Sequence, residues 1–197
     1  SLAIGAGTGA LVRRTVKPLD PGASVEITKD LLADILPGTG SVSVSASRLA
    51  GIDVPALLQA LDRYPYGCSE QTVSRAMPLL YVNALAASEK LGLDGRLDDR
   101  VREAIDRVLS RQDSSGAFGL WSTENASDTW LNAYVTDFLT RARERGFAVP
   151  QTAFNSALDR LRNTVTNATK VEQGGMDLAY AAYVLARNGR PVMGDLR

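Results

Sequence analysis

Residues 64–71 read Tyr-Pro-Tyr-Gly-Cys-Ser-Glu-Gln and stand where the longest helical pattern of the chain begins. Over residues 69–91 that follow, apolar residues recur every three or four positions, which is the spacing of the buried face of a helix. The stretch also holds the only cysteine of the sequence, Cys68, and places Gln71 three residues after it. It therefore marks both the start of a helix and a candidate functional site.

The part of the chain around and after this stretch is helical throughout. Its amphipathic patterns lie near residues 53–63, 69–91, 98–111, 127–145, 151–163 and 175–188. The connections between them are short and several contain glycine, so successive helices should be antiparallel neighbours. Repeated helical hairpins predict a mainly α fold over residues 49–197, an α/α toroid that is incomplete within this chain.

Residues 1–48 follow a different pattern. Apolar and polar residues alternate in several short runs, which Pro- and Gly-containing turns separate, so two or three β-strands are predicted. So few strands are too little for a stable β domain on their own. We therefore expect this β segment to be part of a domain completed elsewhere. The chain begins at Ser1 without a leader pattern, which is typical of a piece of a longer protein.

The composition excludes several classes of function. Lys and Arg together number 22, as do Asp and Glu, so the chain lacks the net positive charge that gathers nucleic acid. No run approaches the roughly 20 apolar residues of a membrane span, so direct membrane insertion by this chain is not expected. The sequence contains no histidine, which removes Ser-His-Asp and Cys-His catalysis and zinc sites of the histidine type. Neither a metal nor a cofactor is expected.

The pair Cys68 and Gln71 has a spacing that suits covalent chemistry. Positions i and i+3 of a helical turn are neighbours, so the cysteine sulfur can reach the carboxamide carbon of the glutamine. Displacement of ammonia by the sulfur would leave an internal thioester, whose acyl group is far more electrophilic than the amide. Gly67 permits the tight backbone entry that such a junction needs. Apolar walls must keep water and amines out, and the residues expected to shield the bond are Tyr64, Tyr66, Met77 and Tyr81.

The stretch from Gly67 to Gln71 resembles the Gly-Cys-X-Glu-Gln thioester motif of the α2-macroglobulin and complement family. The residues on either side of it resemble the bacterial branch, and residues 129–135 and 177–185 resemble inner-helix segments of the family's thioester domain. The resemblance spans about residues 49–190. It implies that residues 49–197 are the N-terminal part of an α/α-toroid thioester domain and that residues 1–48 belong to a CUB-like domain into which the toroid is inserted.

The resemblance also implies a function. Cys68 would supply the thioester sulfur and Gln71 its acyl carbon, while Gly67 and Glu70 match the motif and receive no chemical step. The implied protein is a broad-spectrum protease inhibitor and not an enzyme. A protease cuts its bait region, the thioester is exposed, and an amine of the protease is captured covalently. The implied partners are attacking proteases and the CUB-like and macroglobulin domains of the same long chain. The implied location is the periplasm, with lipid anchoring to the inner membrane in some members.

One departure from the family bears on specificity. Some complement members carry a histidine, shortly before the helix at residue 175, that favours transfer to hydroxyl groups. Residues 163–174 contain none, which favours direct attack by amines such as lysine side chains.

Two other readings stay open from the sequence. A degenerate thioester-family domain would serve only as a binding scaffold and would show a free thiol from the outset. An α/α-toroid enzyme, such as a terpenoid cyclase, would need acidic or Tyr/His/Arg clusters that are not evident here. Trp121 and Trp130 are expected to belong to the hydrophobic core and not to a ligand cavity.

Overall fold

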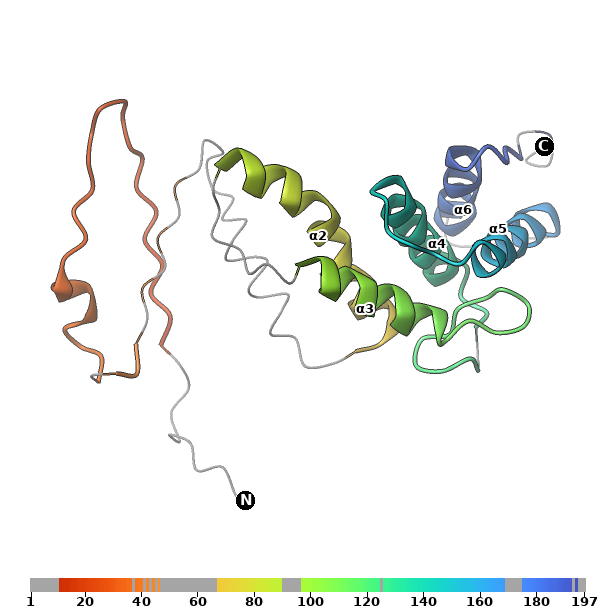
Figure 1. The fold of residues 1–197 in the computed structure, drawn as a ribbon, viewed down its shortest axis with the longest axis horizontal. Helices are drawn as coiled ribbons and strands as arrows, with labels where there is room; N and C mark the ends of the chain where they lie inside the picture. The colour runs from red at the N-terminus through yellow and green to blue at the C-terminus, as the bar shows by residue number, and fades with distance from the viewer. Residues whose placement is uncertain are drawn as a thin grey trace, which may run out of the picture. The chain divides into compact units, whose positions relative to one another are not determined.

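The computed structural model describes residues 11–36, 38–40, 42, 44, 46, 67–89, 97–124, 126–168, 175–192 and 194, with side chains except over 82–89. By its internal contacts the chain divides into two units, Ser1–Ala56 and Leu57–Arg197 (Figure 1).

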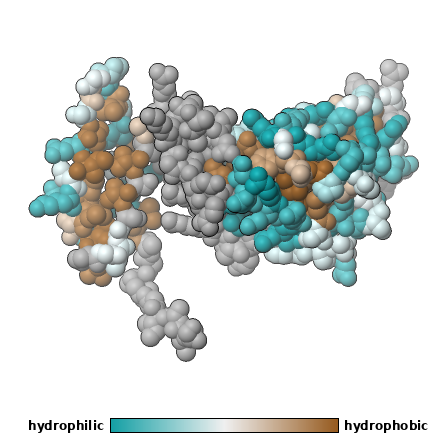
Figure 2. Space-filling view, viewed as in Figure 1, coloured by the Kyte–Doolittle hydropathy of each residue, from teal (hydrophilic) through white to brown (hydrophobic). Residues whose placement is uncertain are grey.

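The described residues of the first unit are extended or turn-like and form no β-strand. A turn at Pro21 and Gly22 and the 3-10 helix η1 (Lys29–Leu32) interrupt the extended backbone. The strands predicted within residues 1–48 are therefore not confirmed. Figure 2 shows the apolar side chains of this unit at its surface, and Val12 and Leu36 are 84% and 76% exposed. Two or three short strands with no other element packed against them gain little stability from pairing with one another. Its assignment to a CUB-like domain stays a prediction.

The second unit is helical, which confirms the mainly α prediction. Its described helices are α2 (Ser69–Glu89), α3 (Leu97–Leu109), α4 (Thr129–Glu144), α5 (Gln151–Thr166) and α6 (Met176–Arg187). Their ends lie within a few residues of the predicted ones, while the helix predicted near 53–63 falls outside the described residues. Asp128 begins α4 as its N-cap, because its carboxylate accepts a hydrogen bond from the Leu131 N–H at 2.8 Å.

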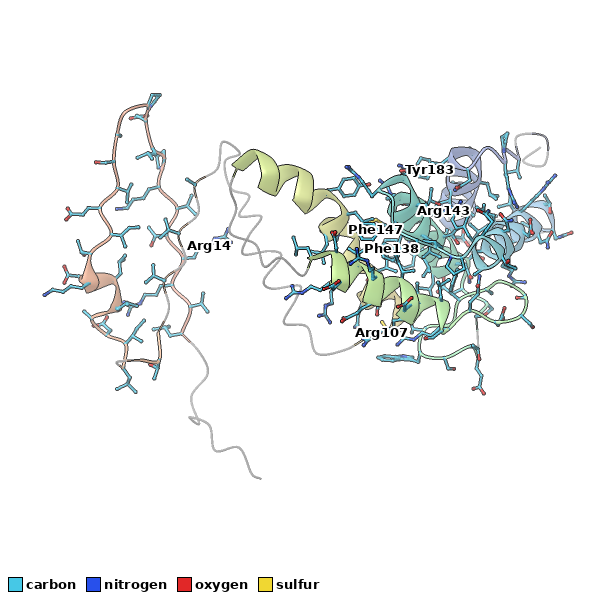
Figure 3. The ribbon with its side chains drawn as sticks, in the orientation of Figure 1. Arg14, Arg107, Phe138, Arg143, Phe147 and Tyr183 are labelled. Atoms are coloured by element: carbon cyan, nitrogen blue, oxygen red, sulfur yellow. The ribbon has the colours of Figure 1, made fainter. Side chains whose placement is uncertain are left out.

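The helices pack in two layers, as in an α/α toroid. The helices α2, α4 and α6 contact one another in sequence order, and α3 and α5 cover them (Figure 1). The central helix is α4, which contacts each of the other four. Its side chains Val135, Phe138 and Leu139 are fully buried, and Phe138 lies in the middle of the unit in Figure 3. The core is therefore organised around α4.

The loop between α3 and α4, residues 110–128, folds back on itself. Gln112 and Phe118 form an antiparallel bridge, and the Asp113 carboxylate accepts hydrogen bonds from the backbone N–H groups of Ser115 and Ala117. The prediction that both tryptophans belong to the core is wrong. Trp121 in this loop is 60% exposed, and Trp130 is 43% exposed because it lies in the first turn of α4.

Asn132 ties this loop to α4 from a buried position. Its Oδ1 accepts a hydrogen bond from the Phe118 N–H at 2.7 Å. Its Nδ2 donates to the carbonyl oxygens of Ala126 at 3.0 Å and Asp128 at 2.7 Å. One side chain thereby satisfies a backbone donor and two backbone acceptors of the loop.

We expect Asn132→Ala to lower the free energy of unfolding by about 3 kcal/mol, since each buried backbone group left without a partner costs about 1–3 kcal/mol. Urea unfolding followed by circular dichroism measures the change. Asn163→Ala is the matched control, because Asn163 is exposed on α5 and its replacement should change stability by less than about 0.5 kcal/mol. Equal stability of the two variants would contradict the role given to Asn132.

Candidate functional site

The start of α2 brings Cys68 and Gln71 together. Cys68 stands just before Ser69, the first helical residue, and its Sγ lies 3.5 Å from the Gln71 backbone nitrogen, whose N–H it accepts. In return, the Cys68 backbone N–H donates to Gln71 Oε1 at 3.3 Å. This reciprocal pair is a capping box in which a thiol replaces the usual hydroxyl. The helix start itself therefore folds the carboxamide of Gln71 back over the cysteine.

The site is held against the loop between α3 and α4. Ser69 is fully buried, and its backbone N–H donates to the Leu120 carbonyl oxygen at 2.8 Å. Its hydroxyl donates to the Gly119 carbonyl oxygen at 2.6 Å. Cys68 beside it is only 5% exposed, while Gln71 is half-buried. Cys68 is therefore largely buried, and the residue after it is hydrogen-bonded to the loop between α3 and α4.

Two arginines from α3 and its C-terminal end face the backbone that leads into Cys68. Arg111 Nη2 donates to the Gly67 carbonyl oxygen at 2.6 Å, and Arg111 Nη1 donates to Ser69 Oγ at 3.2 Å. Arg107 approaches so closely that a Cβ at Gly67 would lie 2.8 Å from its Nη1. Burial and the neighbouring Arg107 lower the pKa of Arg111, and the Cys68 sulfur acts in the opposite direction. The site therefore carries local positive charge although the chain as a whole is neutral.

Neither arginine was predicted from the sequence to belong to the site. Arg107 and Arg111 are four residues apart in the sequence, but Arg111 follows the end of α3, and only the tertiary structure places it against the Gly67 carbonyl oxygen.

Glu70 faces α4. Its Oε1 accepts a hydrogen bond from Ser74 Oγ at 2.7 Å, and Ser74 Oγ also lies 3.0 Å from the Tyr134 hydroxyl. Burial raises the pKa of Tyr134, and the nearby Glu70 and Asp137 carboxylates raise it further against the Ser74 hydrogen bond, so this hydroxyl stays protonated. Glu70 thereby links the first turns of α2 to α4.

The residues named as shielding are placed as follows. Met77 and Tyr81 lie roughly 13 and 20 Å along the axis of α2 from Cys68, at 1.5 Å per residue. Both are half-buried and pack against the helical core, and the Tyr81 hydroxyl accepts a hydrogen bond from Arg141 at 2.8 Å. Tyr64 and Tyr66 lie outside the described residues. Shielding stays a prediction for all four, and the structure gives Met77 and Tyr81 a packing role.

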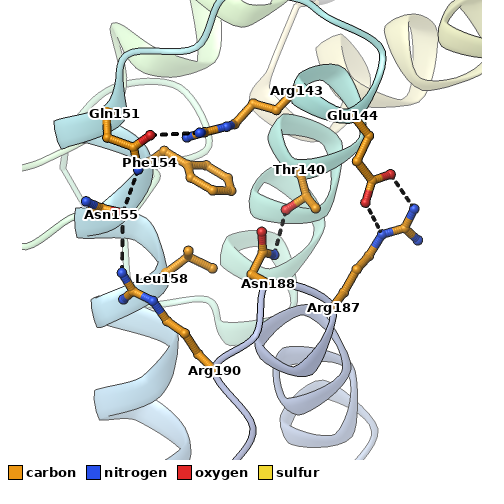
Figure 4. A pocket seen from close by; sticks show the side chains of 10 residues that line it. All are labelled: Thr140, Arg143, Glu144, Gln151, Phe154, Asn155, Leu158, Arg187, Asn188 and Arg190. Carbon is orange, nitrogen blue, oxygen red and sulfur yellow. Dashed lines mark hydrogen bonds and ion pairs between the residues drawn. The ribbon is translucent and has the colours of Figure 1, made fainter.

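A separate cavity of about 540 Å³ lies between the ends of α4 and α6 and the start of α5 (Figure 4). Neither Cys68 nor Gln71 lines it. Among its lining side chains, Arg187 pairs with Glu144, and Arg143 donates a hydrogen bond to Gln151 at 2.7 Å. The Arg143 guanidinium also lies over the Phe154 ring at 4.4 Å from its centroid. Most of these groups are thereby paired, but Arg143 Nη1 is buried without a hydrogen-bond partner among the described residues.

Within the described part of the chain, no group of acidic, cysteine or histidine side chains is arranged to hold a metal ion. None of the described helices combines the length and the apolar character that a membrane crossing requires.

Comparison with known proteins agrees with this geometry. The family model described as the A-macroglobulin TED domain matches residues 41–171. Among curated proteins, the Alpha-2-macroglobulin of Escherichia coli strain K12 is 35% identical over 192 residues, which cover 91% of this chain and 12% of that protein. The Alpha-2-macroglobulin of Xylella fastidiosa strain Temecula1 is 31% identical over 188 residues, which cover 89% of this chain and 11% of that protein.

Solved structures give the same result. A crystal structure of native E. coli alpha-2-macroglobulin, from domain MG7 to the C-terminus, matches 73% of this chain and 24% of its own, with a TM-score of 0.63 and 36% identity. Salmonella alpha-2-macroglobulin reacted with methylamine matches 73% of this chain and 10% of its own, with a TM-score of 0.61 and 37% identity. The fold and the helix-start motif define a thioester-type domain, and the chain belongs to the α2-macroglobulin family. It spans about a tenth of the length of the curated relatives it matches.

Proposed function

We propose that this chain carries the reactive bond of a broad-spectrum protease inhibitor, an internal thioester between Cys68 Sγ and the side-chain carbonyl carbon of Gln71. The observation that supports the proposal is the capping box, which holds the thiol and the carboxamide against each other from both ends. The sulfur attacks the carbonyl carbon, the C–N bond breaks, and ammonia leaves with the thiol proton. The acyl oxygen of the product is Gln71 Oε1.

The bond is used once. A protease cleaves a bait region elsewhere in the long chain, the protein rearranges, and the thioester becomes accessible. An amine of the protease attacks the acyl carbon of Gln71, the C–S bond breaks, and the sulfur leaves as the Cys68 thiol with a proton from the amine. An amide then joins inhibitor and protease. Because residues 163–174 hold no histidine at the place where some complement members carry the one that forms an acyl-imidazole, amines are the preferred nucleophiles. Such a single-use trap is not an enzyme.

We also propose partners and a location for the trap, on the model of the family that the sequence resembles. The partners are attacking proteases and the other domains of the same long chain, and the location is the periplasm, with lipid anchoring to the inner membrane. A Salmonella relative has been crystallised after reaction with methylamine, which makes this small amine the natural probe.

The test is the intact mass of full-length protein before and after methylamine, together with labelling of thiols. We expect a native mass lower by one ammonia than the sequence mass, and the addition of one methylamine as one thiol becomes labelable. Peptide mapping should place the methylamide on Gln71 and the label on Cys68. An unshifted native mass with a thiol that reacts at once would reject the trap and favour a binding scaffold.

A further inference from the structure

The peptide group between Gly67 and Cys68 forms hydrogen bonds through both its carbonyl oxygen and its N–H, and the N–H reaches Gln71 of the reactive pair. Its carbonyl oxygen accepts the short bond from the Arg111 guanidinium at 2.6 Å and a longer one from Thr72 Oγ1 at 3.4 Å. Its N–H donates to Gln71 Oε1 at 3.3 Å. A charged donor on an amide oxygen draws electron density through the conjugated C–N bond, and this makes the N–H of the same amide a stronger donor.

The atom that receives this N–H is the one on which charge develops. The oxygen Oε1 remains on the acyl carbon when ammonia leaves, so it is the carbonyl oxygen of the thioester. When sulfur or an amine adds to that carbon, the oxygen becomes an oxyanion. A preorganised N–H aimed at the oxygen lowers the barrier in both directions of the reaction.

We propose that Arg111 is a positioning residue of the thioester site, which polarises the Gly67–Cys68 peptide so that its N–H stabilises the oxyanion on Gln71 Oε1. The inference rests on the proposed thioester and adds to it the group that governs the rate at which the bond forms and opens.

Two further hydrogen bonds hold Arg111 for this role, and a third holds the serine that accepts one of them. Arg111 Nη1 donates to Ser69 Oγ at 3.2 Å and to the Leu120 carbonyl oxygen at 3.5 Å, and Ser69 Oγ in turn donates to Gly119. Arg111 follows the end of α3, which packs along α2. Its hydrogen bonds to Gly67, Ser69 and Leu120 thus hold the guanidinium in place before any nucleophile arrives, as electrostatic preorganisation requires.

The experiment compares full-length wild-type protein with Arg111→Met and Arg111→Lys. Arg111→Met removes the charge and the donors, and we expect methylamine to open its thioester about tenfold more slowly. The loss should be smaller than the roughly 10²–10³ seen when an oxyanion donor is removed outright, because the N–H itself remains. Arg111→Lys keeps a cation near the Gly67 carbonyl and should recover most of the rate.

A spectroscopic readout separates polarisation from mere structural support. With glutamine labelled with ¹³C at the side-chain carbonyl, the infrared stretching frequency of the thioester should rise in Arg111→Met, because its carbonyl is less polarised, and should return toward the wild-type value in Arg111→Lys. Arg102→Met is the control, since Arg102 lies on α3, the helix that precedes Arg111, and pairs with Asp99 away from the site. It should leave the rate and the frequency unchanged.

The outcomes are distinct. Wild-type protein that shows no loss of ammonia would overturn the proposed thioester and this inference together. Wild-type protein with an intact thioester, beside an Arg111→Met variant that opens at the wild-type rate with an unchanged carbonyl frequency, would overturn the role of Arg111 alone. A slower rate and a higher frequency, both reversed by Arg111→Lys, would support it.

Discussion

Exchange of Cys68 for serine is expected to abolish methylamine incorporation and covalent protease capture while the helical fold is kept. The hydroxyl of serine is the usual side chain at a helix N-cap and can accept the Gln71 N–H in place of the sulfur. It cannot supply the thiolate that attacks the Gln71 carboxamide. The mass should therefore equal that of the unmodified sequence with and without methylamine. After exposure to a protease, denaturing electrophoresis should show no covalent complex.

Comparison with a second variant, Cys68→Ala, separates the contribution of the helix cap to stability from that of the thiol to the chemistry. Cys68→Ala loses both, so it should lack the thioester as Cys68→Ser does and should also lose about 1 kcal/mol of stability. Urea unfolding of the two variants measures this difference. A covalent complex formed by the Cys68→Ser variant would show that the captured protease is held by some other group.

Gly116→Ala is expected to destabilise the helical unit strongly although it lies outside the site. Gly116 has a φ of +86°, and a Cβ there would lie 2.2 Å from the carbonyl oxygen of Ser156 in α5. The left-handed backbone costs an L-residue about 1–2 kcal/mol, and the displacement of a helix backbone adds about 1–3 kcal/mol. We expect a loss of about 2–5 kcal/mol in the free energy of unfolding.

The control is Gly146→Ala. Gly146 has the same φ of +86° but no atom within 4 Å of the added Cβ, so only the backbone cost of about 1–2 kcal/mol should appear. The difference between the two variants in urea unfolding isolates the contact between the loop and α5. If the two glycines tolerate alanine equally, the loop does not pack on α5 as described here.

Hydrophobic periodicity was sufficient to predict the described helices, because the apolar spacing of an amphipathic helix is visible within the segment itself. The same reasoning failed at Trp121 and Trp130, which lie exposed in the loop and in the first turn of α4. The hydrophobicity of a residue alone does not predict whether its side chain, in a loop or a first helical turn, points to the core or to solvent. The alternation within residues 1–48 predicted strands, but a strand also needs a partner, and the described residues of that unit show extended chain without pairing.

The reactive pair belongs to what the sequence alone determines. Cys68 and Gln71 are three residues apart, so the first turn of one helix brings them together whatever the rest of the fold does. The environment of the pair was decided by the tertiary structure. Arg111 is 44 residues from Gly67, and Gly119 is 50 residues from Ser69. Such contacts depend on how α3 and its following loop pack against α2, and no local pattern encodes that packing.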